Sequence, residues 1–328
     1  MRAQYNSVTL ASLGVLRVRG ADALSFLQGQ LSNDLTLLGA QRSLLAGYHN
    51  PQGRVIALLR LLQLAPDDVL ALLPRELIAV VAQRLARFIL RAKVKLADES
   101  AQWTVTGLMG APASDPAALL EQRPAAPRSD GLQRPSAPLA EALPADVNGA
   151  ARSEASLAVR VAGQPARWLL LSGAAQAHAC AGASELPGLT WQRLVVAAGE
   201  PQVYAATSEQ FVAQMLNLDV IGAIDFDKGC YTGQEVIARA HYRGRVKRRL
   251  QRFLTRGAAQ LQPGDTGELT DGRAFKVVDA VPCADGRCEF LAVATLPGEA
   301  GEGNRSAPAE GARRLDAEQL ELPYAIPA

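Results

Sequence analysis

The sequence has 328 residues, of which 48% are hydrophobic, and its formal net charge is +2. This length and composition predict two or three folded domains and exclude a disordered chain, while so small a net charge indicates by itself no preference for nucleic acid or membranes. We expect no signal peptide at Met1 to Val18 and no membrane span, because the densest apolar run, Val55 to Leu64, is interrupted by Arg60. Four cysteines do not provide a disulfide framework in so long a chain, so free thiols in a reducing cytoplasm are expected.

Residues 1–100 have the pattern of a first α+β domain. Val15 to Val18 is typical of a short strand, and Asp22 is placed to cap a brief helix after it. The turn at 50–53 separates two apolar runs and predicts a β-hairpin. Pro74 is suited to the first position of a helix. The apolar residues of that helix follow helical spacing: Leu77, Ile78, Val81, Leu85, Phe88 and Ile89.

Residues 101–245 have the pattern of a second α+β domain, whose chain segments need not be separate in space from those of the first. Strands are predicted at 103–108, 157–161 and 168–171, and a helix at 174–181. The segment 111–156 is rich in Pro, Ala and Ser and predicts a long surface excursion, with a helix at 117–122 as one option. Thr207 and Gln210 have the spacing of a capped helix that would continue to Leu216.

Residues 246–328 are predicted to form a small β-barrel. Their apolar runs are short and are separated by turns at 263–264, 271–272 and 285–286. The Gly-rich segment 297–313 predicts a loop. Cys283 and Cys288 flank the last turn, and a hairpin in which the two side chains face each other is the simplest interpretation.

The most distinctive segment is 226–244, with the sequence Lys-Gly-Cys-Tyr-Thr-Gly-Gln-Glu at 228–235. Thr232 and Glu235 have the N-cap and N3 spacing of a capping box and predict that a helix begins there. Cys230 would then lie just before the helix N-terminus, where the helix dipole, together with Lys228, favours a reactive thiolate.

Alternative interpretations of the same cysteine remain open. Cys230 could be a small buried residue in a tight turn that Gly229 and Gly233 shape, because glycine tolerates positive φ and free cysteine is often buried. A nucleophilic pair of Cys230 with His241 depends on geometry that the spacing does not give. No metal site is predicted, because the histidines show no ligand spacing.

A run of positive side chains follows the signature, with no carboxylate between Glu235 and Asp265. Its members are Arg239, Arg243, Arg245, Lys247, Arg248, Arg249, Arg252 and Arg256. The run is typical either of a solvated strand face or of a surface that binds a polyanion, such as RNA phosphates or a polyglutamate tail. Only Tyr242 and Phe253 are interleaved with it, so stacking of RNA bases is not predicted.

The signature 228–235 resembles that of the YgfZ family of folate-binding proteins, which are relatives of the glycine cleavage T-protein. The resemblance covers most of the chain outside the Pro-rich and Gly-rich segments, and includes 20–23, 26–34, 51–54, 198–199 and 322–324. It implies an α+β fold in which two ferredoxin-like α+β lobes and a C-terminal β-barrel form a three-domain ring around a central folate pocket.

The same resemblance implies a function. It implies binding of tetrahydrofolate or a derivative, and an accessory role in the assembly or repair of iron–sulfur enzymes, which would be the partners, including those that modify tRNA. The cysteine that matches Cys230 is the functional thiol of the family, and Lys228 belongs to the same motif. Trp191 matches one tryptophan of the family's folate site, and Leu13 stands at the place of another. We expect further folate contacts from the rest of the motif: Tyr231, Gln234, Glu235 and Arg239.

Two departures concern the aminomethyltransferase relatives. Those proteins have aspartates just after the turn that matches Gln52-Gly53, where this chain has Ile56, Ala57 and Leu58, and a glutamate where it has Ala197. A carboxylate that orients the folate or moves a proton is therefore missing after the turn, and both losses argue against glycine cleavage. The folate-binding accessory role is therefore the first hypothesis, a folate-dependent one-carbon transferase the alternative, and an RNA-binding module with weak tRNA contact through 239–256 the third.

Overall fold

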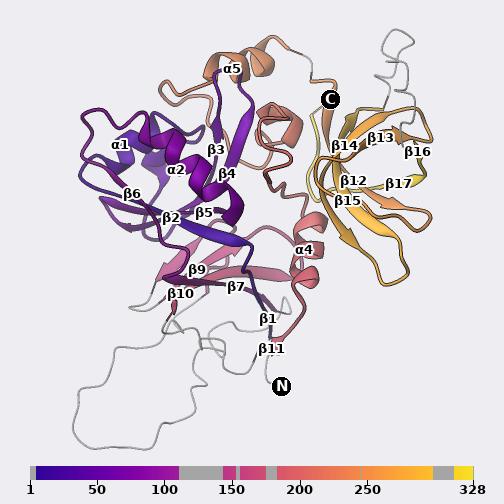
Figure 1. Ribbon diagram of the computed structural model, residues 1–328, viewed down its shortest axis with the longest axis horizontal. Coiled ribbons are helices and arrows are strands. Elements are labelled where there is room, and N and C mark those ends of the chain that lie inside the picture. Colours follow the sequence, from indigo (N-terminus) through magenta and orange to yellow (C-terminus); the bar gives the residue numbers. More distant parts are fainter. Residues whose placement is uncertain are drawn as a thin grey trace, which may run out of the picture.

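The computed structural model describes residues 5–110, 143–152, 156–174, 183–244, 246–297 and 314–327. Within these residues the chain forms three β-sheets with few helices, so the predicted α+β class is confirmed (Figure 1). No described helix is long and apolar enough to cross a membrane. The helix expected at 117–122, almost all of the one expected at 174–181, and most of the loop expected at 297–313 lie outside the described residues.

The first sheet has the strand order β3-β4-β5-β2-β6, and two helices pack against it. Its elements are β2 (Leu13–Arg19), α1 (Ala23–Gln28), β3 (Leu44–His49), β4 (Val55–Ala65), β5 (Asp68–Pro74), α2 (Ile78–Ala86) and β6 (Lys95–Asp98). The predicted hairpin is confirmed, because β3 and β4 pair antiparallel on either side of the turn at 50–53. Phe26, Leu27 and Val81 are buried between the helices and the sheet.

The second sheet has the order β11-β1-β7-β10-β9-β8. Its strands are β1 (Tyr5–Thr9), β7 (Trp103–Gly110), β8 (Ala150–Arg152), β9 (Ser156–Val161), β10 (Ala166–Gly173) and β11 (Ser184–Glu185). The strands β1 and β2 are adjacent in the chain but lie in different sheets. One hydrophobic cluster joins the two sheets, with Leu70 and Leu72 from the first and Val159 and Leu171 from the second.

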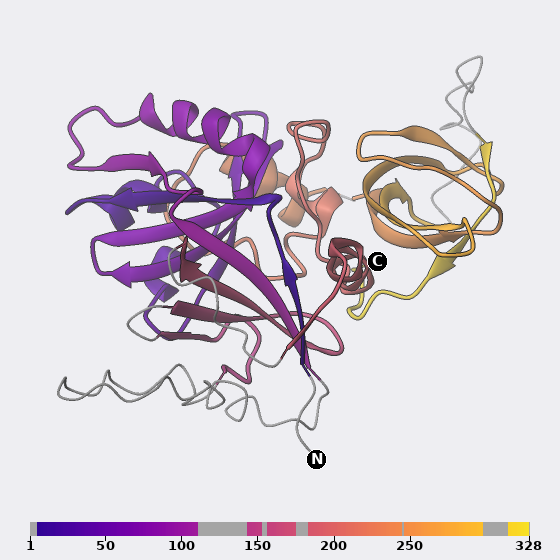
Figure 2. The same cartoon turned by 60° about the horizontal axis from the view of Figure 1, so that its bottom comes forward.

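The third sheet forms the nearly closed C-terminal barrel that the turn spacing predicted (Figure 2). Its strands are β12 (Arg248–Thr255), β13 (Thr266–Leu269), β14 (Ala274–Pro282), β15 (Cys288–Thr295), β16 (Arg314–Leu315) and β17 (Ala317–Leu320). Because β16 pairs with β13 and β17 pairs with β12, the short segment 314–320 bridges the two edges of the sheet. The rings of Phe253, Phe275 and Phe290 fill the interior.

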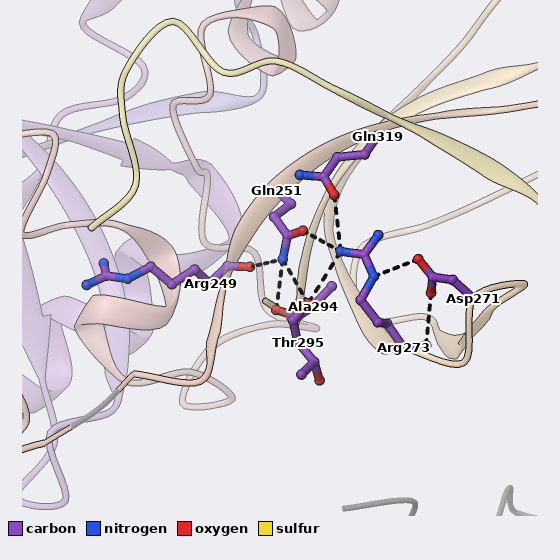
Figure 3. Close-up of polar contacts among 7 residues, drawn as sticks. All are labelled: Arg249, Gln251, Asp271, Arg273, Ala294, Thr295 and Gln319. Atoms are coloured by element: carbon purple, nitrogen blue, oxygen red, sulfur yellow. Dashed lines mark hydrogen bonds and ion pairs between the residues drawn. The ribbon is translucent and has the colours of Figure 1, made fainter. Parts of the chain in front are cut away.

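A buried guanidinium links the strands where the barrel closes (Figure 3). Arg273 donates from Nη1 to Oε1 of Gln251 at 2.8 Å and to Oε1 of Gln319 at 3.1 Å, and from Nε to Asp271 at 2.7 Å. Gln251 in turn donates to the carbonyl of Ala294 at 2.9 Å. Since a planar guanidinium has donors in a fixed fork, this one side chain links β12 and β17 in addition to their backbone ladder.

The helix predicted from Thr207 to Leu216 is wrong apart from its last turn, the 3₁₀ helix η4 (Ala213–Leu216). The backbone of this segment pairs with the start of β4 instead: Glu209 N–H donates to the Val55 carbonyl at 2.7 Å, and Val55 N–H to that of Phe211 at 2.8 Å. Backbone groups used in this way cannot form a helix.

Other local predictions need smaller corrections. Pro74 ends β5, and a 3₁₀ turn separates it from α2, which ends at Ala86 and leaves Phe88 exposed. Asp22 precedes α1, but its carboxylate accepts from the backbone N–H of Lys93 at 2.7 Å rather than capping the helix. Lys93 lies 71 positions after Asp22 in the sequence, so a local pattern does not reveal this partner.

The two cysteines of the barrel hairpin do not face each other as expected. Cys288 pairs with Pro282, and the N–H of Cys283 donates to the Arg287 carbonyl in the next position of the ladder. Side chains of successive residues in a strand point to opposite faces, so Cys288 enters the barrel core while Cys283 points away from it. Cys283 is a free cysteine.

The barrel is joined to the second lobe by a buried carboxylate. Asp279 of β14 is 1% exposed and accepts from Nε2 of Gln192 at 2.7 Å, from the hydroxyl of Tyr204 at 3.1 Å and from the N–H of Ala280 at 2.9 Å. Gln192 belongs to helix α4 (Gly188–Ala197). Burial raises the pKa of Asp279 to about 6, although these three donors lower it.

We expect this junction to make stability pH-dependent. The pKa of Asp279 is raised on folding, so its contribution to stability is fully present below the ordinary aspartate pKa and is lost as the pH rises through about 6. The shift from 3.8 to about 6 corresponds to about 3 kcal/mol. Urea unfolding of the wild type and of Asp279→Asn, between pH 3.8 and about 6, measures this effect. As the pH rises, the unfolding free energy of the wild type should fall relative to that of the variant. A difference that is independent of pH would contradict this account.

Candidate functional site

Lys228 anchors the signature loop to the first lobe, which consists of the first sheet with α1 and α2. The side chain is 8% exposed, and its ammonium donates to the carbonyls of Gln28 at 2.7 Å, Leu31 at 2.6 Å and Asn33 at 2.9 Å. Burial lowers the pKa of Lys228 to about 8, while the carboxylates of Asp34 and Asp225 raise it. All three ammonium protons are used in this arrangement, so the side chain acts here as a clamp between distant segments.

A local turn at Asp225 positions Lys228 for these contacts. The Oδ1 atom of Asp225 accepts from the backbone N–H of Asp227 at 2.8 Å and of Lys228 at 3.1 Å. An aspartate that binds backbone groups two and three residues ahead fixes a turn without help from secondary structure. The turn directs Lys228 toward the loop that follows α1.

A helix does follow the signature, but it has no capping box. Helix α5 (Gln234–Tyr242) begins after Gly233, which has φ +83°, and no side chain caps it. A Cβ atom at Gly233 would lie 2.5 Å from the carbonyl oxygen of Asn50, so the hairpin turn at 50–53 packs directly on the helix start. The interpretation of Thr232 and Glu235 as a capping box is therefore wrong, and the glycine positions the helix instead.

Cys230 is exposed, so the interpretation as a small buried residue is wrong. It lies between Gly229, beside which a Cβ would meet open space, and Tyr231, which is buried and contacts the Lys228 ammonium at 5.1 Å from its ring centroid. Burial raises the pKa of Tyr231 to about 12. The thiol thus lies at the surface next to the buried Tyr231, and its reactivity remains a prediction.

The other predicted residues of the motif lie close by on α5. Gln234 donates to the Lys228 carbonyl at 3.4 Å, while Glu235 and Arg239 are exposed. His241 stacks on Phe226 with ring centroids 3.8 Å apart, and no hydrogen bond joins it to Cys230 among the described residues. The structure therefore brings the motif residues together on one side of the first lobe.

A separate cavity of about 570 Å³ lies where the two lobes and the barrel meet. Its polar side chains include Arg60 of β4, which donates to Glu200 Oε1 at 3.0 Å and to Asn148 Oδ1 at 2.8 Å. Arg160 of β9 and Arg252 of β12 also line it. Its apolar lining comes from Leu45, Val147, Ala197, Ala198, Val220, Ile221 and Pro323. A concave, largely apolar site with a few fixed polar groups is typical of a small-molecule site.

The C-terminal segment forms one wall of this cavity. Tyr324 donates from its hydroxyl to the carbonyl of Gly199 at 2.7 Å and accepts from Nδ2 of Asn217 at 3.4 Å. Gly199 has φ +64°, and a Cβ there would lie 2.7 Å from Leu322. Segments 198–199 and 322–324 both belong to the resemblance with the YgfZ family but lie far apart in the sequence. They meet at the cavity.

Trp191 and Leu13 lie together, but in the core between the two sheets. The Trp191 ring packs on Gly107, where a Cβ would lie 2.3 Å away, and the guanidinium of Arg167 lies 5.0 Å from the ring centroid. Neither Trp191 nor Leu13 is among the described residues that line the cavity. The sequence analysis did not identify Arg60, Glu200 and Asn148 as residues of a binding site. For Arg60 a signal was present, because a charged residue inside the apolar run of β4 needs a buried partner.

The chemistry of the cavity is that of a binding site. Ile56, Ala57 and Leu58 are buried in β4, so no carboxylate projects from the place where the transferase relatives were expected to have one. Glu200, the one carboxylate among the described residues of the lining, is paired with Arg60. No group of three or more metal-ligating side chains occurs in the described part of the chain.

Known proteins resemble this chain in sequence and in fold. No family model matches the chain. It is 33% identical over 260 residues to the tRNA-modifying protein YgfZ of Edwardsiella ictaluri, covering 77% of this chain and 72% of that protein. It is 30% identical to the protein of the same name from Cronobacter sakazakii, covering 97% and 93%. The fold is similar to that of the glycine cleavage system aminomethyltransferase T from Bartonella henselae, with a TM-score of 0.67, 14% identity, and coverage of 89% and 79%. The chain therefore belongs to the YgfZ family.

Proposed function

We propose that the chain is a cytoplasmic folate-binding accessory protein that supports the assembly or repair of iron–sulfur enzymes, including those that modify tRNA. The observation that carries the proposal is the cavity of about 570 Å³ between lobes and barrel, in a fold similar to an aminomethyltransferase. The relatives' name links the family to tRNA modification.

The residues of the cavity fit tetrahydrofolate. Arg60, Arg160 and Asn148 offer donors, Glu200 offers an acceptor, and the surrounding side chains are apolar. The folate has ring amides, an apolar middle and terminal carboxylates, and guanidinium groups match carboxylates in geometry and charge. When bound, it would carry a one-carbon unit.

The second half of the proposal concerns Cys230. An exposed thiol next to a fixed loop can reach a client enzyme, whereas a buried one cannot. One cysteine cannot complete a four-thiolate cluster site, so a cluster transiently held there would take its other ligands from the client.

The experiment separates the two halves. Ala197 lines the cavity, so Ala197→Phe should weaken tetrahydrofolate binding at least about tenfold by isothermal titration, because the added ring fills the site. Leu189→Phe, at an exposed position of the same helix, is the matched control and should bind as the wild type does. Equal binding by Ala197→Phe would show that folate binds elsewhere, and Trp191→Ala then tests the core position between the sheets.

Cys230→Ala should keep folate binding and the unfolding midpoint, because the side chain is exposed and outside the cavity lining. In a strain that lacks the protein, this variant should fail to restore tRNA methylthiolation. Normal methylthiolation would remove the thiol from the proposal and leave the folate site untouched.

The fold similarity also favours a second candidate, a folate-dependent one-carbon transferase. It predicts turnover of 5,10-methylenetetrahydrofolate with an amine. The burial of Ile56 to Leu58 and the ion pair of Glu200 leave no unpaired acid on the described lining to move a proton, so this candidate ranks second.

A further inference from the structure

An aromatic cluster lies on the surface beside the signature. The rings of Phe226 and His241 stack with centroids 3.8 Å apart and planes 18° apart, and Tyr242 meets His241 edge-on at 4.7 Å. Tyr242 is 65% exposed and His241 is also exposed. His241 and Tyr242 are adjacent at the end of α5, and folding brings Phe226, which precedes the signature loop, onto His241.

Positive side chains lie beside Tyr242. Arg239 is three residues before Tyr242 on α5, so these two side chains share one face, and Arg243 follows Tyr242 as the C-cap of the helix. Both arginines are exposed, and no ion pair involves them among the described residues.

The later part of the basic run is partly neutralised. Three of its arginines are paired with a carboxylate in or beside the barrel: Arg249 with Asp219, Arg252 with Glu289, and Arg256 with Asp316. Lys247 and Arg248 are exposed, and no ion pair involves them in the described part of the chain. Phe253 is buried in the barrel core. The charge of the later run is therefore partly neutralised, whereas Arg239 and Arg243 lie beside Tyr242 with no ion-pair partner among the described residues.

We propose that this surface, formed by Phe226, Arg239, His241, Tyr242 and Arg243, binds single-stranded nucleic acid. The exposed rings of His241 and Tyr242 offer faces on which unpaired bases stack, while the half-buried Phe226 packs against the core and supports His241. The guanidinium groups of Arg239 and Arg243 bind the phosphates between the bases. A duplex keeps its bases stacked inside and cannot use the rings. Charge and ring geometry together favour a polyanion with aromatic bases over an apolar protein segment.

The proposal is tested by fluorescence anisotropy with a labelled single-stranded RNA of about 12 nucleotides, within the range of known site sizes. Tyr242→Ala should weaken binding about tenfold, as loss of one stacked base does elsewhere. Arg239→Gln should reduce the slope of log affinity against log salt by about 0.7, the value for one phosphate contact on a single strand. Arg256→Gln, an arginine of the same run that is paired with Asp316, is the control and should change neither value.

Single-stranded DNA and duplex RNA of the same sequence complete the test. Equal affinity for DNA would identify stacking and phosphate as the whole interaction, and stronger RNA binding would add a contact to the 2′-hydroxyl; either supports the proposal. It is overturned if no binding occurs at low salt, if duplex RNA competes as well as the single strand, or if Tyr242→Ala and Arg256→Gln behave alike. Reduced capture of a client enzyme by Tyr242→Ala, without RNA binding, would instead identify a protein-docking surface and refute the proposal.

Discussion

Replacement of Gly233 by alanine is expected to lower the free energy of unfolding by about 4 kcal/mol, because two costs coincide. The residue has φ +83°, which disfavours any side chain, and the new Cβ would lie 2.5 Å from the backbone oxygen of Asn50. A backbone oxygen in a hairpin turn cannot move aside as a flexible side chain can. The start of α5 would therefore separate from the turn at 50–53. Urea unfolding measures the loss.

The chain offers a matched control within the same motif. Gly229 has open space where its Cβ would lie and is not among the glycines with positive φ. We expect Gly229→Ala to change the unfolding free energy by less than about 0.5 kcal/mol. If both variants lose the same stability, the packing of α5 on the hairpin does not explain the glycine at 233.

Replacement of Lys228 by methionine should also cost about 4 kcal/mol, because three carbonyls lose a charged donor and each buried acceptor left unsatisfied costs about 1–3 kcal/mol. Methionine keeps the length of the side chain but leaves the carbonyls of Gln28, Leu31 and Asn33 without their shared donor. Since these carbonyls belong to the first lobe, the signature loop would lose its anchor. Faster modification of Cys230 by a thiol reagent, measured alongside unfolding, would report the released loop.

Lys247→Met is the control for this variant, because Lys247 is exposed and lies nearby in the chain. Its unfolding free energy should stay within about 0.5 kcal/mol of the wild-type value. A small effect at Lys228 would show that the carbonyls accept hydrogen bonds from water or from other donors instead. Lys228 would then be a candidate for a chemical role rather than a structural one.

The two candidate centres of the protein are therefore distinct in structure. The signature presents Cys230 and the aromatic cluster at the surface, whereas the cavity lies between lobes and barrel and is lined by other residues. Lys228 and Gly233 fix the first centre, and Arg60 and Tyr324 organise the second. Separate variants can thus assign folate binding, thiol chemistry and nucleic-acid binding independently.

The sequence by itself determined the elements whose signals are local. Alternating or continuous apolar residues identified β2, the hairpin of β3 and β4 and the strands of the barrel, and the signature predicted a helix where α5 begins. Such patterns succeed because backbone conformation depends strongly on neighbouring residues, as turns with Gly and Pro illustrate. The reason given for α5 was nonetheless wrong, since the left-handed Gly233 and not a capping box starts it.

Only the tertiary structure decided which groups meet. Lys228 binds carbonyls about 200 positions earlier, Arg60 pairs with Glu200 across 140 positions, and Asp279 reaches Gln192 across 87. The same holds for the pairing with β4 that replaced the predicted helix after Thr207. Local spacing cannot specify such partners, because each contact depends on how whole sheets pack and on which polar groups that packing buries and must satisfy.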